Sequence, residues 1–268
     1  MNAIVATIIV TYKNTPQSLE GIENSLSTNG MDKKDIYFSD NTKNNLGYSG
    51  GINRILKKIL HKYDYFFIVN PDVIIKKDCL TLLVKALEKD KTIGIVGPKI
   101  LQEAGKIWSL GGVLDKKRYS GGLIGYGKSD IKNNETKKSI DFISGTAMLI
   151  NKNVFETIGF FAEEYFLYYE DVDFCLRAQK AGFNLAICPD AEITHFASST
   201  IGINSPVQQY YMARNHMWIV EEFAPFSVKL HEFLRLPKTL FQARDKKYEL
   251  LGIRDYFLRK KGRHDYWN

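Results

Sequence analysis

Short apolar runs alternate with longer amphipathic segments along the first two thirds of the chain. Apolar runs that end at turn residues are typical of buried strands, and segments with an apolar residue every three or four positions are typical of helices. This alternation predicts an α/β fold with a mostly parallel central sheet flanked by helices. The predicted strands are residues 4–10, 36–38, 65–70, 93–98, 140–150 and 185–187, and the predicted helices include residues 52–61, 79–89 and 171–181.

Local sequence signals mark the ends of several elements and one loop. Thr15 is placed to cap a helix that begins at Pro16, because the first residue of a helix does not use the N–H that proline lacks. Gly182 suits the C-terminal cap of the helix that precedes it. Asparagine and glycine dominate residues 44–51, which we predict to be a loop at the carboxyl ends of the strands, where open α/β sheets bind ligands. Residues 107–126 are rich in glycine and predict a hairpin or flap.

Composition supports a folded globular domain. The chain has 268 residues, 44% of them hydrophobic, and is long enough to bury a large core. Its cysteines, Cys79, Cys175 and Cys188, lie far apart, so their spacing indicates neither a disulfide framework nor a zinc site, and a reducing cytoplasm fits best. The first apolar run follows no basic leader and is predicted to be a strand instead of a signal peptide. No apolar run reaches the length of about 18 residues that would span a bilayer.

The basic charge of the chain is concentrated at its C-terminal end. Between Lys229 and His264 there are eleven Lys or Arg and four Asp or Glu, an excess that equals the net charge of +7 for the whole chain. Many apolar residues are interleaved with these basic ones, so the segment is predicted either to lie on a membrane surface or to pack on the main domain with a solvated basic face. We assign residues 1–225 to the main domain and residues 226–268 to a basic amphipathic helical appendage.

Polar side chains follow the predicted strands at positions that a ligand could reach. Asp72 stands after Asn70 and Pro71 at the end of a strand, where one carboxylate can hold Mg²⁺ or Mn²⁺ against a diphosphate, although the same residues also favour a plain turn. His195 follows another strand and could complete a metal site or have a structural role. Asp40 could accept hydrogen bonds from a ribose or a base, or it could form an Asx-turn.

An acidic cluster and one basic residue add candidates for catalysis. Glu170, Asp171 and Asp173 begin a predicted helix, whose dipole would keep carboxylates ionised, as a general base requires. Helix capping by Asp171 and an ion pair between Asp173 and Arg177 are the competing interpretation. Arg214 could neutralise a departing diphosphate, or it could belong to ordinary helix surface.

Several of these residues fall within short motifs that stand in a distinctive order. The motifs are VATIIVTY at 5–12, DN at 40–41, NLGYSGGIN at 45–53, NPDV at 70–73, GPKI at 97–100, SGTAMLI at 144–150 and YEDVD at 169–173, with Arg177 and Gly182 beyond. Together they resemble the motifs of family 2 glycosyltransferases with the GT-A fold, most closely the rhamnosyltransferase-like branch that builds bacterial surface polysaccharides. The resemblance covers about residues 4–215, and its specificity lies in the joint order of the motifs.

The resemblance implies an inverting transfer of a sugar from a nucleoside diphosphate sugar to an acceptor hydroxyl, with a divalent cation (Mg²⁺ or Mn²⁺) as cofactor. Asp171 aligns with the family's catalytic base, Asp72 with the last acid of its metal-binding motif, and His195 with a further metal ligand of some relatives. Asn70 departs from the family pattern, which has an acid there. The other implied roles are catalysis for Glu170, nucleotide-sugar binding for Thr11, Asp40, Asn45, Gly47, Gly50, Asn53 and Arg214, and the acceptor or sugar pocket for Ser144, Gly145, Tyr169 and Asp173.

The resemblance also suggests partners and a location. The first expected donor is dTDP-rhamnose, followed by UDP-linked hexoses that include galactofuranose, and the expected acceptor is a lipid-linked glycan. The enzyme would be cytoplasmic and peripheral on the inner membrane surface, and its C-terminal helices could form a homodimer contact. Nucleic-acid binding is not expected, because no recognition motif accompanies the charge. The alternative is a non-catalytic protein that binds nucleotide sugars or polysaccharides, whereas a dinucleotide-dependent dehydrogenase lacks support because its glycine fingerprint is absent.

Overall fold

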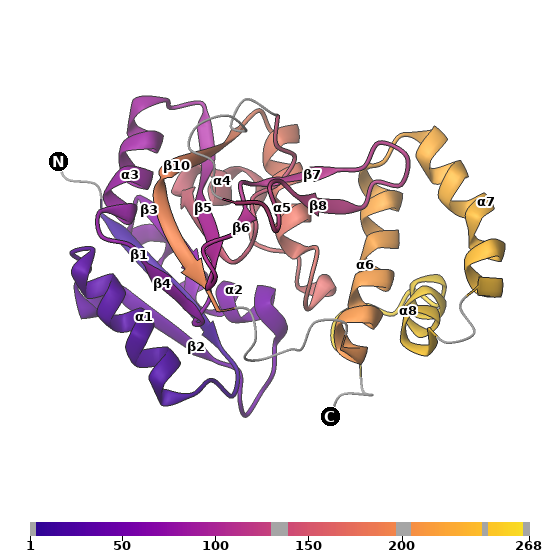
Figure 1. Cartoon of the computed structure of the whole chain (residues 1–268), viewed down its shortest axis with the longest axis horizontal. Coiled ribbons are helices and arrows are strands. Elements are labelled where there is room, and N and C mark those ends of the chain that lie inside the picture. The colour runs from indigo at the N-terminus through magenta and orange to yellow at the C-terminus, as the bar shows by residue number, and fades with distance from the viewer. Residues whose placement is uncertain (1–3, 130–138, 197–204, 243–245, 265–268) are drawn as a thin grey trace.

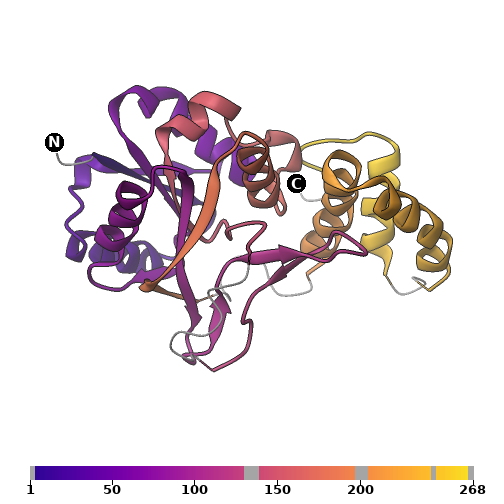
Figure 2. The same cartoon turned by 90° about the horizontal axis from the view of Figure 1, so that it is seen from above.

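The computed structural model describes residues 4–129, 139–196, 205–242 and 246–264. A mixed sheet with helices on both faces forms the larger part of the molecule, and three helices from the C-terminal third lie beside it (Figures 1 and 2). The predicted α/β class is confirmed. The helices are α1 (Pro16–Thr28), α2 (Gly47–Ile59), α3 (Cys79–Lys89), α4 (Lys152–Ile158), α5 (Glu170–Lys180), α6 (Pro206–Phe223), α7 (Phe226–Gln242) and α8 (Lys247–Phe257).

The described strands form one large sheet and a separate hairpin. They are β1 (Val5–Thr11), β2 (Ile36–Asp40), β3 (Tyr65–Val69), β4 (Val73–Ile75), β5 (Ile93–Gln102), β6 (Ile107–Ser109), β7 (Gly112–Leu114), β8 (Gly121–Leu123), β9 (Ala147–Asn151) and β10 (Asn184–His195). The large sheet has the order β2-β1-β3-β9-β5-β10-β4, with β6 paired to β5, while β7 and β8 pair with each other in the region predicted to be a flap.

Strand directions correct the expectation of a mostly parallel sheet. β1 is parallel to β2 and β3, and β5 is parallel to β10. β9 lies antiparallel between β3 and β5, and β4 and β6 are also antiparallel to their neighbours. The sheet is therefore mixed. The sequence could not reveal this, because a strand buried on both faces has the same apolar pattern whichever way it runs.

The core lies in two layers, one on each face of the sheet, because successive residues of a strand point to opposite sides. On one face, Ile8 of β1 and Phe66 of β3 pack with residues of α2, α4 and α5. On the other face, Ile9 and Phe67 pack with residues of α1 and α3. This double cover accounts for the continuous apolar runs in the central strands.

The predicted helix caps of α1 and α5 are present. Pro16 is the first residue of α1, and the Thr15 hydroxyl accepts a hydrogen bond from the Ser18 N–H at 3.3 Å. Gly182 follows the end of α5 with a φ of +92°, in the left-handed region that glycine adopts without steric cost.

The start of α2 corrects the predicted loop over residues 44–51. Helix α2 already begins at Gly47, so the second half of that segment is helical. Gly51 shows why glycine is present there: a Cβ at this position would lie 2.7 Å from a methyl carbon of Val10. Glycine therefore allows α2 to pack closely on β1, and the residue type reflects packing instead of loop flexibility.

The C-terminal helices pack on one another through a close contact between α6 and α8. A Cβ at Gly252 of α8 would lie 2.3 Å from the carbonyl oxygen of Tyr210 in α6. The Tyr210 hydroxyl donates a hydrogen bond to the buried Asp255 carboxylate at 3.0 Å. Within the described residues, no helix is both long and apolar enough to cross a bilayer. The domain boundary after residue 225 stays a prediction.

We expect Gly252→Ala to lower the free energy of unfolding by about 1–3 kcal/mol, because the new methyl group would force α6 and α8 apart. Gly21→Ala in α1 is the matched control, since a Cβ there meets no atom within 4 Å. The control should instead raise the free energy of unfolding by about 0.5–1 kcal/mol. Urea titrations of both variants measure this, and equal stabilisation by the two alanines would contradict the close contact.

Candidate active site

The chain fold brings Asp72 and His195 together. Asp72 lies in the turn between β3 and β4, and His195 ends β10, where it pairs in register with Val73 of β4. The distance between Asp72 Oδ1 and His195 Nε2 is 3.4 Å. The Trp108 ring packs edge-to-face against the His195 ring, with centroids 4.9 Å apart, and holds the imidazole in this orientation. The structure therefore brings Asp72 and His195 together, and their role as metal ligands stays a prediction.

Asp72 and His195 together suit a divalent cation that is also coordinated by the phosphates of a bound substrate. His195 is buried, and its Nδ1 atom has no hydrogen-bond partner among the described residues. The described residues contain no cluster of three or more His, Cys, Asp or Glu side chains that could hold a metal ion by themselves. Mg²⁺ characteristically takes one or two protein carboxylates and completes its shell with phosphate and water, which Asp72 allows, and the imidazole of His195 suits a transition metal such as Mn²⁺ better than Mg²⁺.

Asp171 lies at the N-terminal end of α5 with both carboxylate oxygens engaged. Oδ2 accepts a hydrogen bond from the Gly145 N–H and Oδ1 from the Val172 N–H, each at 2.8 Å. Burial raises the pKa of Asp171, and these backbone hydrogen bonds oppose the rise. The residue keeps some exposure to solvent, so an acceptor molecule could reach it. A fixed carboxylate that remains accessible is suited to act as a general base.

Residues 144–146 connect Asp171 with the turn that carries Asp72. Gly145 donates its N–H to Asp171, and the Thr146 carbonyl accepts a hydrogen bond from the Asn70 N–H at 2.9 Å. The hydroxyls of Ser144 and Thr146 lie 3.0 Å apart, and Ser144 is partly exposed. The predicted pocket residues Ser144 and Gly145 are thus located between the two acidic sites.

Tyr48 is a site residue that the sequence analysis missed. Its hydroxyl donates a hydrogen bond to the Gly145 carbonyl. Burial raises the pKa of Tyr48 well above its usual value, and the negative charges of Glu170, Asp171 and Asp72 add to the rise. Tyr48 therefore lies close to both acidic sites. Its place inside the NLGYSGGIN motif was the one signal that could have found it.

Glu170 differs from its neighbour Asp171 in burial and hydrogen bonding. It is 5% exposed, and its Oε2 atom has no hydrogen-bond partner among the described residues. Burial, and then the negative charge of Asp171, raise the pKa of Glu170 to about 8. The Glu170 side chain is therefore mostly protonated at neutral pH, whereas a general base must be ionised.

Asp173 and Asn53 hold a neighbouring loop, which corrects the predicted ligand contacts of both. The buried Asp173 carboxylate pairs with Arg177 at 2.7 Å, and Arg177 donates to the carbonyls of residues 158 and 160. The Asn53 amide donates to the Phe161 carbonyl at 2.8 Å and accepts from the Phe161 N–H at 3.2 Å. Neither side chain has its polar groups free for a sugar, and the competing interpretation of Asp173 is confirmed.

Arg214 also holds this loop, which corrects its predicted contact with a diphosphate. Only 1% of Arg214 is exposed. Its guanidinium donates to the carbonyls of Glu164 at 3.2 Å, Tyr165 at 2.9 Å and Gly262 at 2.7 Å. Its neighbour Asn215, which we had not singled out for a role, lies within 2.8–3.0 Å of three carbonyl oxygens of residues 165–168. Both side chains on α6 are therefore structural, because their donors are used by buried carbonyls.

The predicted nucleotide contacts Thr11 and Asp40 lie side by side at the carboxyl ends of β1 and β2. The exposed Asp40 side chain accepts a hydrogen bond from the Thr42 N–H at 2.8 Å, and hydrogen bonding by Thr42 lowers the Asp40 pKa. Asn45 accepts from the Gly47 N–H at 3.0 Å, and so helps to start α2. The structure groups these residues as expected, and their contact with a nucleotide stays a prediction.

Gly47 and Tyr169 show how closely the loop before α5 packs on α2. A Cβ at Gly47 would lie 2.3 Å from the Phe166 carbonyl oxygen, and that oxygen accepts a hydrogen bond from the Tyr48 N–H at 2.8 Å. Gly50 is buried one turn further along α2. Tyr169 is buried with a φ of +71°, and its ring lies 6.1 Å from that of His216. Roles for these residues in sugar binding stay predictions.

Known proteins resemble this chain in sequence. Residues 41–205 match the family described as "Glycosyltransferase like family 2". The low-salt glycan biosynthesis hexosyltransferase Agl10 of Haloferax volcanii is 29% identical over 180 residues, which cover 65% of this chain and 54% of that protein. The N-acetylglucosaminyl-diphospho-decaprenol L-rhamnosyltransferase of Mycobacterium tuberculosis is 25% identical over 180 residues, which cover 59% of this chain and 58% of that protein. The chain thus spans little more than half the length of these relatives.

A solved structure agrees with the fold. The mannosyltransferase PcManGT from Pyrobaculum calidifontis, in complex with GDP-Man and Mn²⁺, aligns with a TM-score of 0.55 at 14% identity. The alignment covers 97% of this chain and 75% of that one. At this identity the likeness concerns the fold alone, and the predicted GT-A fold is confirmed.

We expect Glu170→Gln to flatten the dependence of stability on pH. Because folding raises the pKa of Glu170, the folded state binds the proton more tightly, and stability is lost as pH rises through about 8. From pH 5 to pH 9 the variant should therefore lose less unfolding free energy than the wild type, by at least about 1 kcal/mol. Urea titrations at both pH values measure the difference. The exposed Glu88→Gln should follow the wild type, and parallel curves for Glu170→Gln and wild type would contradict the shifted pKa.

Proposed function

The chain belongs to the family 2 glycosyltransferases, and we propose that it transfers a sugar with inversion from a nucleoside diphosphate sugar to a hydroxyl of a lipid-linked glycan. The observation that carries this proposal is the position of Asp171. Its carboxylate is oriented by the Gly145 N–H, and the next peptide unit, at Thr146, accepts the Asn70 N–H beside Asp72. A base and a metal-binding turn are thus joined by one short segment.

Asp171 is the proposed general base. Its carboxylate takes the proton of the acceptor hydroxyl while the hydroxyl oxygen forms a bond to the anomeric carbon of the donor. The bond from that carbon to the diphosphate oxygen breaks, and the diphosphate leaves with the bonding electron pair. Attack and departure on opposite sides of the carbon invert its configuration. The hydrogen bonds from Gly145 and Val172 support this role because they fix the carboxylate before the acceptor arrives.

Asp72 and His195 are the proposed protein ligands of a divalent cation. A bound Mg²⁺ or Mn²⁺ would stabilise the negative charge of the departing diphosphate. The short distance between Asp72 Oδ1 and His195 Nε2 supports this assignment, because a cation beside them could contact both atoms. The Mn²⁺ in the mannosyltransferase of similar fold supports it as well. The donor's phosphates would complete the coordination in the absence of an acid at Asn70.

Thr11, Asp40 and Asn45 are the proposed contacts to the nucleotide. Thr11 and Asp40 end neighbouring parallel strands, and Asn45 lies in the short connection from β2 to α2. Ligands of open α/β sheets bind at this edge, where the strands end. The exposed Asp40 carboxylate can accept hydrogen bonds from a ribose hydroxyl or a base N–H.

The donor and acceptor are proposed from the relatives. The Mycobacterium tuberculosis relative is by name an L-rhamnosyltransferase that acts on N-acetylglucosaminyl-diphospho-decaprenol. We therefore place dTDP-rhamnose first among donors and UDP-linked hexoses second, and we propose a lipid-linked glycan as acceptor in the synthesis of a surface polysaccharide. Such an acceptor would bring the enzyme to the cytoplasmic face of the inner membrane.

Asp171→Asn should lower the rate of sugar transfer about 10²–10⁴-fold, because the amide cannot take the acceptor proton. Donor binding should remain, since Asn keeps the shape of the side chain and an oxygen that can accept the Gly145 N–H. Transfer rates and donor affinity measured on the same preparation separate the two effects. Full turnover in the variant would contradict the assignment of the base.

A saturating nucleotide-sugar donor with Mn²⁺ should raise the melting temperature by about 5 °C, because a ligand that binds only the folded state stabilises it. Asp72→Ala should remove the part of the shift that depends on Mn²⁺, whereas Asp78→Ala, outside the site, should keep it. A thermal-shift screen of dTDP-rhamnose, UDP-sugars and GDP-sugars, with and without Mn²⁺, measures this. Stabilisation without turnover over a broad acceptor panel would favour the non-catalytic binding protein.

A further inference from the structure

Helix α7 carries four large apolar side chains on its outer face, while Val228 and Leu236 are buried on its inner face. Phe226, Leu230, Phe233 and Leu234 recur at the spacing of one helix face, and all four are exposed, Leu234 to 67% and Phe226 to 78%. Glu232, on the opposite face, is only 2% exposed. A surface helix normally exposes polar side chains on its outer face, so this exposed stripe of large apolar residues marks an interaction surface.

The inward face of α7 is held by the apolar packing of Val228 and Leu236 and by polar contacts. The buried Glu232 carboxylate accepts hydrogen bonds from Arg235 at 3.0 Å and from Arg118, in the hairpin between β7 and β8, at 3.4 Å. Burial acts to raise the pKa of Glu232, but hydrogen bonding by Arg235 and the charges of Arg235 and Arg118 lower it overall. These contacts fix the rotation of α7 about its axis. The apolar stripe therefore faces away from the protein because the opposite face is anchored.

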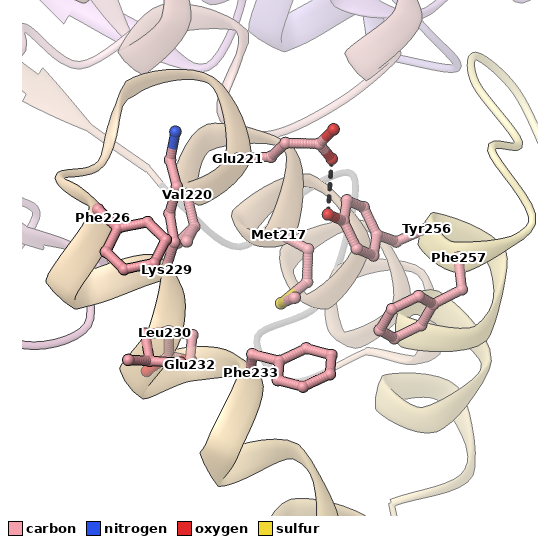
Figure 3. A pocket seen from close by; sticks show the side chains of 10 residues that line it. All are labelled: Met217, Val220, Glu221, Phe226, Lys229, Leu230, Glu232, Phe233, Tyr256 and Phe257. Atoms are coloured by element: carbon pink, nitrogen blue, oxygen red, sulfur yellow. Dashed lines mark hydrogen bonds between the residues drawn. The ribbon is translucent and has the colours of Figure 1, made fainter.

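An open groove of about 300 Å³ extends the stripe toward α6 and α8. Figure 3 shows Met217 of α6, Phe233 of α7 and Phe257 of α8 turned toward the same space. Phe257 and the adjacent Leu258 are more than half exposed. Helix α7 and the C-terminal end of α8 thus contribute the exposed side chains that we call the apolar face: Phe226, Leu230, Phe233, Leu234, Phe257 and Leu258.

The C-terminal helices carry many exposed basic side chains, while two of their acids are internal. Glu232 and Asp255 are buried and paired with Arg or Lys. Glu221, which lines the groove, pairs with Arg259, and Glu249 pairs with Lys246, while Glu222 at the end of α6 is exposed. The outer surface of the C-terminal helices is therefore strongly positive. Its exposed basic residues are Lys238, Lys246, Lys247, Arg254, Arg259, Lys260, Lys261 and Arg263.

We propose that the apolar face and the exposed basic side chains of the C-terminal helices dock on the surface of an anionic lipid bilayer. The apolar side chains enter the boundary between headgroups and acyl chains, and the Lys and Arg side chains meet the lipid phosphates. The charge argues for a bilayer and against a second copy of the chain, because two such faces would bring their positive surfaces together. The docking surface is inferred from the geometry of α7. Its purpose, to bring the enzyme to a lipid-linked acceptor, rests on the proposed function.

The test measures binding of the full chain to vesicles of phosphatidylglycerol and phosphatidylcholine in equal parts, by sedimentation. The wild type should bind these vesicles, release at high salt, and bind pure phosphatidylcholine vesicles much more weakly. The double variant F233Q/L234Q should partition about tenfold less, because it removes two apolar side chains from the docked face. Lys238→Glu should also reduce binding at low salt.

Matched variants outside the apolar face show whether a loss of vesicle binding is specific to that face. Phe38→Gln on β2, at the far edge of the sheet, replaces another exposed aromatic residue, and Lys89→Glu on α3 reverses another exposed charge. Both should bind vesicles like the wild type. Because Phe233 and Leu234 are exposed, the double variant should keep the wild-type melting temperature. Wild-type binding by F233Q/L234Q, or equal binding to neutral and anionic vesicles, would overturn the proposal.

Two parallel measurements test whether a second copy of the chain covers the apolar face and whether the proposed sugar transfer takes place. Light scattering without vesicles reports self-association: a dimer that F233Q/L234Q dissociates, with no vesicle binding by the wild type, would assign the apolar face to a second copy and overturn the proposal. Sugar transfer to a water-soluble acceptor is assayed on the same proteins. Intact transfer with lost vesicle binding in F233Q/L234Q would support the surface, and vesicle binding without any transfer would contradict the proposed function alone.

Discussion

The carbonyl groups of residues 158–168 impose the constraint on which the site depends. Phe166, Tyr168 and Tyr169 have φ between +65° and +71°, so this loop cannot continue as a regular helix or strand, although its Phe166 carbonyl accepts the Tyr48 N–H of α2. Its buried carbonyls need other donors, and α2, α5 and α6 supply them from Asn53, Arg177, Arg214 and Asn215. Asp171 follows this loop immediately, so its position is set by these hydrogen bonds.

The same constraint makes the C-terminal helices part of the site. Arg214 joins the carbonyls of Glu164 and Tyr165 to that of Gly262, so one guanidinium connects the loop before α5 with the segment after α8. The Gly262 N–H returns a hydrogen bond to the Glu164 carbonyl at 2.7 Å. On the other side, the hairpin between β7 and β8 reaches α7 through Arg118 (Figure 2). The helices that present the apolar face are thus tied to the backbone that positions Asp171.

Positions that follow from neighbouring residues could be predicted from the sequence. The roles of residues whose hydrogen-bond partners are far away in the chain could not. The cap at Thr15 and the location of Asp72 at a strand end could be predicted, because each follows from its neighbours in the chain. Asn53 and Arg214 resembled ligand contacts because a polar side chain in a glycosyltransferase motif suggests a substrate. Their actual partners are backbone carbonyls 48 or more residues away, which no local pattern reveals. The direction of β9 was hidden for the same reason.

The assignment of the base rests on hydrogen bonding and not on the order of the two acids in the sequence. Glu170 and Asp171 share a low-dielectric environment, and two adjacent carboxylates resist ionising together. Asp171 receives two backbone N–H donors, which favour its charged form, whereas the Oε2 atom of Glu170 has no partner among the described residues. These hydrogen bonds favour the proton of the pair on Glu170 and support the proposal that Asp171 is the base. The loop anchored by Arg214 and Asn215 leads into the helix turn that carries both carboxyl groups, while the N–H groups of Gly145 and Val172 favour the charged form of Asp171.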